Sequence, residues 1–537
     1  MDTALEHATA PGPRGRGAAY ALLSGALLAL AFPKFGHPAV AFVALTPLYV
    51  ALSGWTGRPN QFRGVSARRG FMLGLLTGVI AYAGTVYWTS GTVMTFGGLP
   101  WLVAVPVTFL LVLYMSLYVA LSSAAAAIMI QRFGAAGLLM APATWVAAEY
   151  ARAHVFGGFP WIPLGNAVVS LLPIAQLASA LGVYGLSWLL ALLHALFAYV
   201  AMTSGRRRVA AVLAAVVLVA GSSIWGALRL RDGRLARDGT PLQVALIQGN
   251  VPQSEKWDPS RAESILDRYL RMTREASARG AELIIWPESA TPFYFDEDPA
   301  SAFRVRQLVS EIRTPLLFGT DEVEPGSPPK YYNSAFILND SGTTAAVYRK
   351  MFLVPFGEYV PFGTLLTFVG PLVEAVSAFS PGQGVTMLPV AGHMVSTAIC
   401  YEVVYPHLIR QGVLQGAELL TTITNDAWYG GTSAPFQHFE LARMRAIEQG
   451  RYLARAANTG ISGIVDPYGR VTVRTALFET MAPMGEVRFI QERTVYARIG
   501  DLTAQLAVLI TLLGVGAATK VPRVPKVPRV PRVPQGA

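Results

Sequence analysis

The chain has 537 residues, a mean hydropathy of +0.42, and only 14% charged residues, which is too apolar for an ordinary soluble protein. The formal net charge of +11 favours contact with anionic lipid or nucleic acid. A single cysteine excludes an intramolecular disulfide and a multi-cysteine metal site.

The first part of the chain predicts a membrane domain. A short polar start is followed by an apolar run at residues 18–33, which we interpret as a first span because further apolar segments follow at once. Residues 1–235 are therefore predicted to form seven transmembrane helices. The six further spans are expected at 38–54, 71–90, 100–130, 136–153, 167–203 and 209–228.

Arginines in alternate connections predict the orientation of these helices. Short cytoplasmic loops carry an excess of Lys and Arg, so the N-terminus is expected in the cytoplasm and everything after residue 230 on the outer side. The arginines in question are Arg14, Arg16, Arg58, Arg63, Arg68, Arg69, Arg132, Arg206, Arg207 and Arg208.

Residues 241–492 have the pattern of an extramembrane α/β domain. Short apolar runs alternate there with amphipathic helices and Pro/Gly turns, which predicts a central sheet covered by helices. Strands are expected at 242–249, 282–286, 315–319 and 417–424, and helices at 260–278, 303–312 and 435–456.

Residues 500–519 return to membrane character and predict an eighth span, after which the chain ends in the cytoplasm. The tail at 520–537 repeats Lys/Arg-Val-Pro with period three, which suits polyproline II and puts its cations on one face. Such a strip fits the anionic inner leaflet, although a disordered solubilising tail is an equal alternative. We expect the positive charge to serve lipid and not nucleic acid.

Cys400 ends an apolar run that predicts a buried strand, and residues 403–411 after it predict a helix. A thiol near a helix N-terminus is expected to favour the thiolate, which is the nucleophilic form. The alternative is a buried structural cysteine.

Two further reactive residues lie at the end of an apolar strand or beside a turn. Glu288 comes just after the predicted strand at 282–286, and Lys350 precedes a turn-rich segment. With Cys400 they supply a general base, a cation for an oxyanion and a nucleophile. No nearby histidine lies in a Cys–His protease signature, and the sequence has no nucleotide loop, metal cluster or cofactor fingerprint.

The Glu288, Lys350 and Cys400 set resembles the nitrilase (carbon–nitrogen hydrolase) superfamily, and the flanking spans resemble the apolipoprotein N-acyltransferase family of the bacterial envelope. Phe352 departs from the histidine that members often have two residues after the lysine. The similar motifs are Gln248-Gly-Asn-Val-Pro-Gln253, Trp286-Pro-Glu-Ser289, Pro355-Phe-Gly-Glu-Tyr-Val-Pro361, Cys400-Tyr-Glu402, Asn425-Asp-Ala-Trp-Tyr-Gly430, Gln437-His438, Ala442-Arg-Met-Arg-Ala-Ile-Glu448 and Ala456-Ala-Asn-Thr-Gly-Ile-Ser462.

The resemblance implies an αββα sandwich on the periplasmic side of the bacterial inner membrane. It implies Glu288 as base, Lys350 as oxyanion stabiliser and Cys400 as nucleophile, with Glu358 orienting the lysine and the base. It further implies that the site is supported by Trp257, Tyr401 and Glu402.

The implied reaction moves a fatty acyl chain from a membrane phospholipid, through a cysteine thioester, to the α-amine of the diacylglyceryl-cysteine that begins a lipoprotein. One alternative is a membrane-anchored amidase or nitrilase that uses water as acceptor. The other is a transporter whose outer domain only binds.

Overall fold

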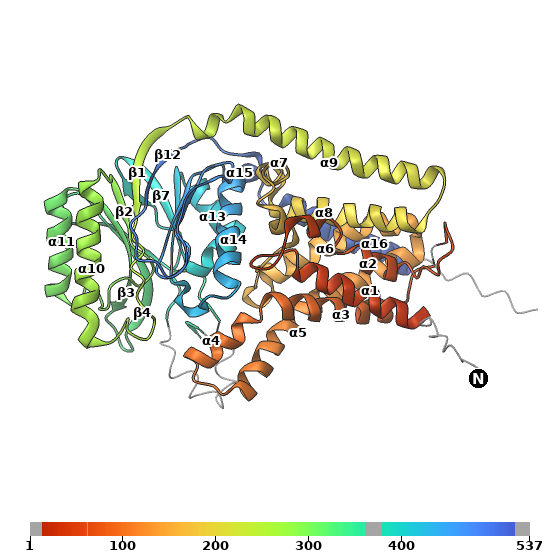
Figure 1. Cartoon of the computed structure of the whole chain (residues 1–537), viewed down its shortest axis with the longest axis horizontal. Helices are drawn as coiled ribbons and strands as arrows, with labels where there is room; N and C mark the ends of the chain where they lie inside the picture. Colours follow the sequence, from red (N-terminus) through yellow and green to blue (C-terminus); the bar gives the residue numbers. More distant parts are fainter. Residues whose placement is uncertain (1–12, 62, 356, 360–378, 521–537) are drawn as a thin grey trace, which may run out of the picture.

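The computed structural model describes residues 13–61, 63–355, 357–359 and 379–520. A region of long helices lies beside a region of two sheets flanked by helices (Figure 1). The basic Val-Pro repeat lies outside the described residues from residue 521 onward. The main helices of the first region are α1 (Pro13–Ala29), α2 (Thr46–Leu52), α3 (Ala67–Thr85), α4 (Trp88–Phe96), α5 (Trp101–Phe133), α6 (Ala135–His154), α8 (Ala178–Met202), α9 (Arg206–Asp232) and α16 (Leu502–Lys520).

Small residues allow α3 to lie close against α5. Gly70, Gly74 and Gly78 recur every four residues and so share one face of α3. A Cβ atom at Gly74 would lie 2.4 Å from the Ser123 Oγ of α5, and one at Gly70 would lie 2.7 Å from the Ala127 Cβ. The stripe is therefore a small-residue interface of the kind that packs helices in membranes.

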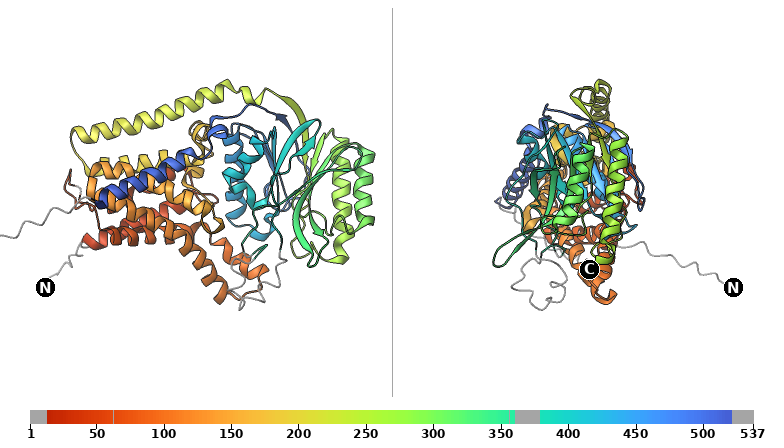
Figure 2. Two further views of the ribbon diagram at one scale, coloured as in Figure 1. Left: turned by 180° about the vertical axis from the view of Figure 1, so that it is seen from behind. Right: turned by 90° about the vertical axis from the view of Figure 1, so that its left-hand side faces the viewer.

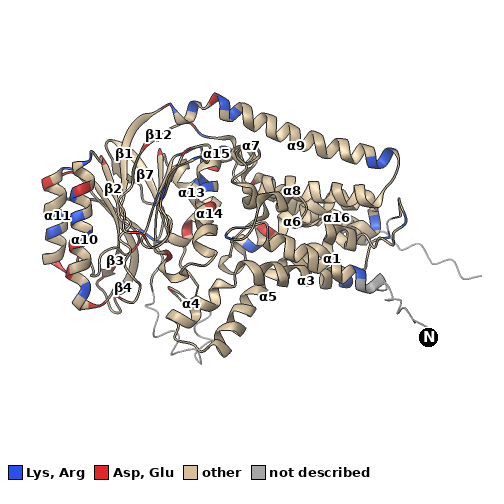
Figure 3. Ribbon diagram, viewed as in Figure 1, with Lys and Arg blue, Asp and Glu red and all other residues tan. Residues whose placement is uncertain are grey.

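Among the residues that the structure describes, four helices, α5, α8, α9 and α16, are long and apolar enough to cross a membrane, and the pair α3 and α4, bent by 55°, would make a fifth span. This supports the predicted helical membrane region but not the count of eight spans. Lys and Arg gather at the end of the helices that lies away from the sheets (Figure 3).

The predicted span at 167–203 is wrong as a single segment. The chain there forms two short helical turns, η3 (Leu164–Val168) and α7 (Leu172–Ala175), before α8 begins at Ala178. Pro173 stands at the start of α7, where it cannot continue a helix from the preceding turn. Gly182 then adopts φ of 70° and kinks α8.

Two six-stranded sheets form the second region. The first has the order β12-β1-β2-β3-β4-β5, with β1, β2 and β3 parallel, and the second has the order β11-β10-β9-β8-β7-β6, with β7, β8 and β9 parallel. Their bounds are β1 (Thr240–Leu246), β2 (Leu283–Ile285), β3 (Leu316–Glu324), β4 (Lys330–Leu338), β5 (Thr344–Arg349), β6 (Leu388–Val390), β7 (His393–Ile399), β8 (Leu419–Thr424), β9 (Leu453–Ala457), β10 (Gly463–Val465), β11 (Val471–Arg474) and β12 (Met484–Phe489).

The sheets pack face to face and each is covered by two helices. Apolar side chains of both sheets form one buried cluster, which includes Val244 and Ile285 of the first sheet and Val395 and Ile423 of the second. Helices α10 (Pro259–Ala278) and α11 (Pro299–Ile312) cover the outer face of the first sheet. Helices α13 (Pro406–Leu414) and α14 (Ala434–Gln449) lie between the second sheet and the long helices (Figures 1 and 2). This is the expected αββα arrangement.

The predicted helix at 435–456 is wrong after residue 449. Helix α14 ends at Gln449 because Gly450 adopts a left-handed conformation, with φ of 62°, that closes the helix. Leu453–Ala457 is strand β9 in the middle of the second sheet. Neighbouring strands on both sides determine its structure more than its own alanine-rich sequence does.

Candidate active site

Glu288, Lys350 and Cys400 all follow strand ends and meet at the edge where the two sheets face each other. Glu288 comes after β2 and Lys350 directly after β5, both in the first sheet, whereas Cys400 follows β7 of the second. The Lys350 Nζ lies 3.3 Å from Glu288 Oε1 and 2.8 Å from the Oε1 of Glu358. Cys400 lies near enough for the Glu288 carboxylate to act electrostatically on its thiol. All four side chains are buried.

Burial and mutual charge define the protonation states of these groups. Burial raises the pKa of the Glu288 carboxyl, but Lys350 and Asn333 outweigh it and hold the pKa below its ordinary value. Burial lowers the pKa of the Lys350 ammonium, but Glu358 and Glu288 raise it well above its ordinary value. The resting site therefore holds an ionised carboxylate beside an ammonium.

Burial, and then the Glu288 carboxylate, raise the pKa of the Cys400 thiol well above its ordinary value. Both effects disfavour the resting thiolate that was expected from the sequence, because they oppose a second anion in the buried site. Forming the nucleophilic thiolate in this site therefore requires a nearby base to accept the proton, and Glu288 is the carboxylate with the largest effect on the thiol.

The backbone of the nucleophile is in an unusual conformation. Cys400 has φ of 52°, a left-handed value that costs a residue with a side chain about 1–3 kcal/mol. It opens a short helical turn, η6 (Cys400–Val404), directly after β7. The strain must be stabilised by neighbouring contacts, and Glu402 supplies several of them.

Glu402 joins the nucleophile turn to the lysine turn. Its Oε2 accepts a hydrogen bond from the Ile399 N–H at 2.8 Å. Its Oε1 accepts from the Tyr348 hydroxyl at 2.8 Å and from the backbone N–H groups of Met351 and Phe352 at 2.7 and 3.1 Å. A single buried carboxylate thus fixes the residues beside Cys400 and those beside Lys350.

Comparison with known proteins gives the family. Residues 24–196 match the family model described as Apolipoprotein N-acyltransferase N-terminal domain, and residues 243–488 match Carbon-nitrogen hydrolase. An "Apolipoprotein N-acyltransferase" of Geobacter metallireducens is 40% identical over 91% of this chain and 92% of its own length. The chain belongs to the apolipoprotein N-acyltransferase family. It is accordingly an acyltransferase, and the amidase reading has less support.

A second curated protein and a solved structure are also similar to the chain. An "Apolipoprotein N-acyltransferase" of Methylococcus capsulatus is 34% identical over 90% of this chain and 92% of its own length. The solved amidase from Nesterenkonia sp. AN1 resembles 49% of this chain, with 98% of its own chain covered, 22% identity and a TM-score of 0.37.

Three residues at the site of this N-acyltransferase family member were not found from the sequence. Asn333 on β4 donates from its Nδ2 to Glu288 Oε1 at 2.8 Å and to Glu358 Oε1 at 2.9 Å. The Asn425 backbone N–H donates to Glu288 Oε2 at 2.9 Å. The ammonium of Lys256 donates to the Glu288 backbone oxygen at 3.1 Å, and burial lowers the pKa of Lys256 to about 8. The motif Asn425-Asp-Ala-Trp-Tyr-Gly430 was a signal for Asn425, but β4 carried none for Asn333.

The other two predicted supporting residues differ in their placement. Tyr401 is buried, and its ring lies 5.8 Å from that of Phe159 in the loop after α6. Trp257 is 43% exposed and packs against Tyr294, with ring centroids 5.9 Å apart. No contact in the described structure joins Trp257 to the three reactive groups.

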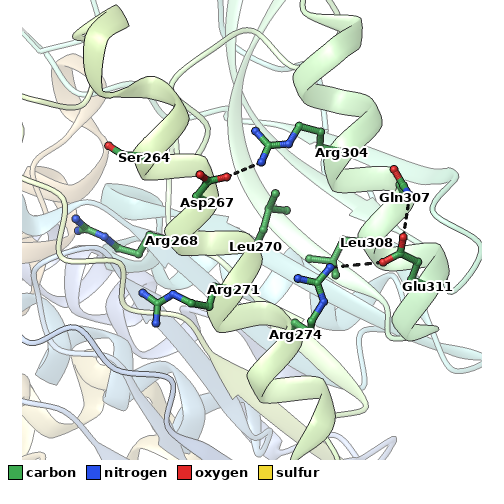
Figure 4. Close-up of a pocket in the computed structure, with 10 residues that line it drawn as sticks. All are labelled: Ser264, Asp267, Arg268, Leu270, Arg271, Arg274, Arg304, Gln307, Leu308 and Glu311. Carbon is green, nitrogen blue, oxygen red and sulfur yellow. Dashed lines mark hydrogen bonds and ion pairs between the residues drawn. The ribbon is translucent and has the colours of Figure 1, made fainter.

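A groove of about 580 Å³ lies between α10 and α11, on the outer face of the first sheet (Figure 4). Its lining includes Arg304 paired with Asp267, and Arg274 paired with Glu311 at 3.5 Å. None of the three reactive residues lines it, so this groove is separate from the candidate active site.

Proposed function

We propose that Cys400, Glu288 and Lys350 perform the acyl transfer of this family in two steps. In the first step the Cys400 sulfur attacks the ester carbonyl of a membrane phospholipid while Glu288 takes the thiol proton. The Lys350 ammonium stabilises the oxyanion of the tetrahedral intermediate. Collapse breaks the ester bond, Glu288 returns its proton to the leaving oxygen, and a lysophospholipid departs from a cysteine thioester.

The second step uses the same groups. The free α-amine of the diacylglyceryl-cysteine that begins a lipoprotein attacks the thioester carbonyl. Glu288 takes a proton from the amine as the amide bond forms, and the thiolate leaves and regains its proton. Atoms and charge therefore balance over the cycle, and the products are an N-acylated lipoprotein and a lysophospholipid.

The observation that supports this assignment best is the position of Glu288 beside both Lys350 and Cys400. Its carboxylate lies 3.3 Å from the Lys350 Nζ and acts electrostatically on the Cys400 thiol, in a buried site. A base that lies beside both the nucleophile and the ammonium that stabilises the oxyanion can move a proton in each step. In the same proposal Glu358 orients Lys350, Glu402 and Tyr401 hold the nucleophile turn, and Trp257 supports the site from its rim.

We propose a membrane arrangement to match. Residues 1–235 form seven spans and residues 500–519 an eighth in the bacterial inner membrane, with the domain at 241–492 in the periplasm and both termini in the cytoplasm. The basic ends of the long helices support this orientation, because they lie away from the sheets (Figure 3). The basic tail at 520–537 would then meet anionic headgroups of the inner leaflet.

The test is to incubate the purified chain with phospholipid and no acceptor and to weigh the intact protein. We expect the wild type to gain one fatty-acyl mass that hydroxylamine removes, and Cys400→Ala to gain none. A diacylglyceryl-modified lipopeptide should then discharge the adduct to an amide much faster than water does. An unmodified wild type would refute the thioester, and discharge by water alone would favour the amidase.

A further inference from the structure

Helix α14 carries two neighbouring buried residues with different partners. Gln437 contacts the helical region: its Nε2 donates to the backbone oxygens of Pro33 and Thr85, each at 3.1 Å, and its Oε1 accepts from the Trp161 indole at 2.8 Å. His438 instead contacts the active site. Both side chains are almost completely buried.

The His438 ring touches the backbone of the nucleophile. Its Nε2 lies 3.1 Å from the Cys400 backbone oxygen, and since that oxygen only accepts, Nε2 carries the proton and donates. This contact acts on the carbonyl side of a residue whose φ is left-handed, at 52°. On the N-terminal side of Cys400, Glu402 accepts a hydrogen bond from the N–H of the preceding residue, Ile399. His438 and Glu402 therefore restrain the nucleophile from opposite ends.

A buried ionic pair anchors the far side of the ring. Nδ1 of His438 lies 2.9 Å from Asp426 Oδ1 and 3.1 Å from Arg455 Nη2, and Arg455 pairs with Asp426 Oδ2 at 2.8 Å. Arg455 is on β9 and Asp426 follows β8, so two central strands determine where the imidazole stands. Such a buried network resists rotation of the ring.

We propose that His438 is a positioning residue of the acyl transfer, which holds the Cys400 backbone oxygen so that the thiol stays beside Glu288. This inference rests on the proposed function, in which Cys400 is the nucleophile. His438 takes no proton in either step and acts only through the backbone of Cys400. Small displacements of a nucleophile lower rates strongly, by up to about 100-fold for 1 Å.

Two substitutions separate this role from a purely structural one. In His438→Gln the amide nitrogen stands near the place of Nε2 and can still donate to the Cys400 oxygen. In His438→Asn the amide nitrogen stands near the place of Nδ1, so contact with Asp426 remains but the bond to Cys400 is lost. Gln437→Met is the matched control, since it is equally buried on the same helix and removes contacts only with the helical region.

The measurement is the rate of acyl-enzyme formation by intact mass in a single turnover, together with thermal unfolding of each variant. We expect His438→Asn to slow acylation about 10- to 100-fold, and His438→Gln and Gln437→Met to stay within a few-fold of wild type after correction for folded protein. Wild-type rates in His438→Asn would overturn the proposal. Equal slowing in the two His438 variants, or in Gln437→Met, would do so as well, by assigning the effect to packing.

The same measurements distinguish a failure of the proposed function from a failure of the role of His438. If wild-type protein forms no acyl adduct, the thioester mechanism is refuted before His438 is tested. If wild type forms the adduct and His438→Asn forms it as fast, only the positioning role is lost.

Discussion

Asn333 offers the sharpest test of the electrostatics at the site. Its Nδ2 donates to the carboxylates of Glu288 and Glu358 at 2.8 and 2.9 Å, and it has no reactive chemistry of its own. Asn333→Leu keeps a side chain of similar size but removes both donors. A hydrogen bond to a charged group contributes about 1.5–3 kcal/mol.

Only the bond to Glu288 acts on the base, so its loss should disfavour the ionised carboxylate by about 1.5–3 kcal/mol, which corresponds to roughly 1–2 pH units in the acid limb of the acylation rate. The direction with pH follows from the donor. Asn333 favours the ionised form and lowers the pKa of Glu288, so its removal raises that pKa. The acid limb of the rate profile should therefore move to higher pH.

The assay is single-turnover acyl-enzyme formation by intact mass across a pH series. Ser334→Ala is the control, because Ser334 is the next residue on β4, is also buried, and donates instead to Glu322 Oε2 at 2.8 Å. The control should leave the acid limb where it is in the wild type. An unmoved acid limb in Asn333→Leu would refute the view that hydrogen bonding tunes this base.

Two further predictions concern stability. Burial raises the pKa of Asp321 from 3.8 to about 6, although Ser289 donates a hydrogen bond to its carboxylate at 2.8 Å. Because the folded protein binds this proton more tightly than the unfolded chain does, the wild type loses stability as the pH rises from about 4 to about 6. Asp321→Asn should thus match wild type below pH 4 and be more stable above pH 6 by up to about 3 kcal/mol, as thermal unfolding at two pH values would measure; a gain independent of pH contradicts this. In Glu402→Gln, the side-chain NH₂ group would face a backbone N–H that now donates to the carboxylate, such as the N–H of Ile399. Because two donors cannot bond to each other, this variant should lose about 1–3 kcal/mol of stability and acylate more slowly. An unchanged melting temperature would count against the described role of Glu402.

Local patterns predicted where two of the candidate reactive groups lie in the fold. Glu288 and Cys400 follow short apolar runs that form β2 and β7, and such runs are recognisable without any tertiary information. Asn333 could not be found in this way, because β4 begins with Lys330-Tyr-Tyr and its place beside Glu288 depends on pairing with β3 and β5. Lys256 was missed because a lysine in a loop is ordinarily solvent-exposed.

The elements that were predicted wrongly have a common physical origin. The 435–456 segment has helical composition throughout, but its last part lies between β8 and β10, and the sheet overrides propensity there. The resting state of the thiol likewise depends on burial and on Glu288, which are properties of the folded site. Sequence patterns suggested these candidate groups, whereas the three-dimensional surroundings determine their protonation.

The residues after Cys400 contact the loop after α6 and so join the sheet region to the helical region. The hydroxyl of Tyr405 donates to the backbone oxygens of Gly157 and Gly158 at 3.2 and 3.1 Å, and the ring of Tyr401 stacks on Phe159. A fragment cut free near residue 240 would expose Tyr401 and Tyr405 to solvent and would lack their contacts with Gly157, Gly158 and Phe159. A released fragment should therefore acylate Cys400 more slowly than the full chain, even when phospholipid is supplied in solution.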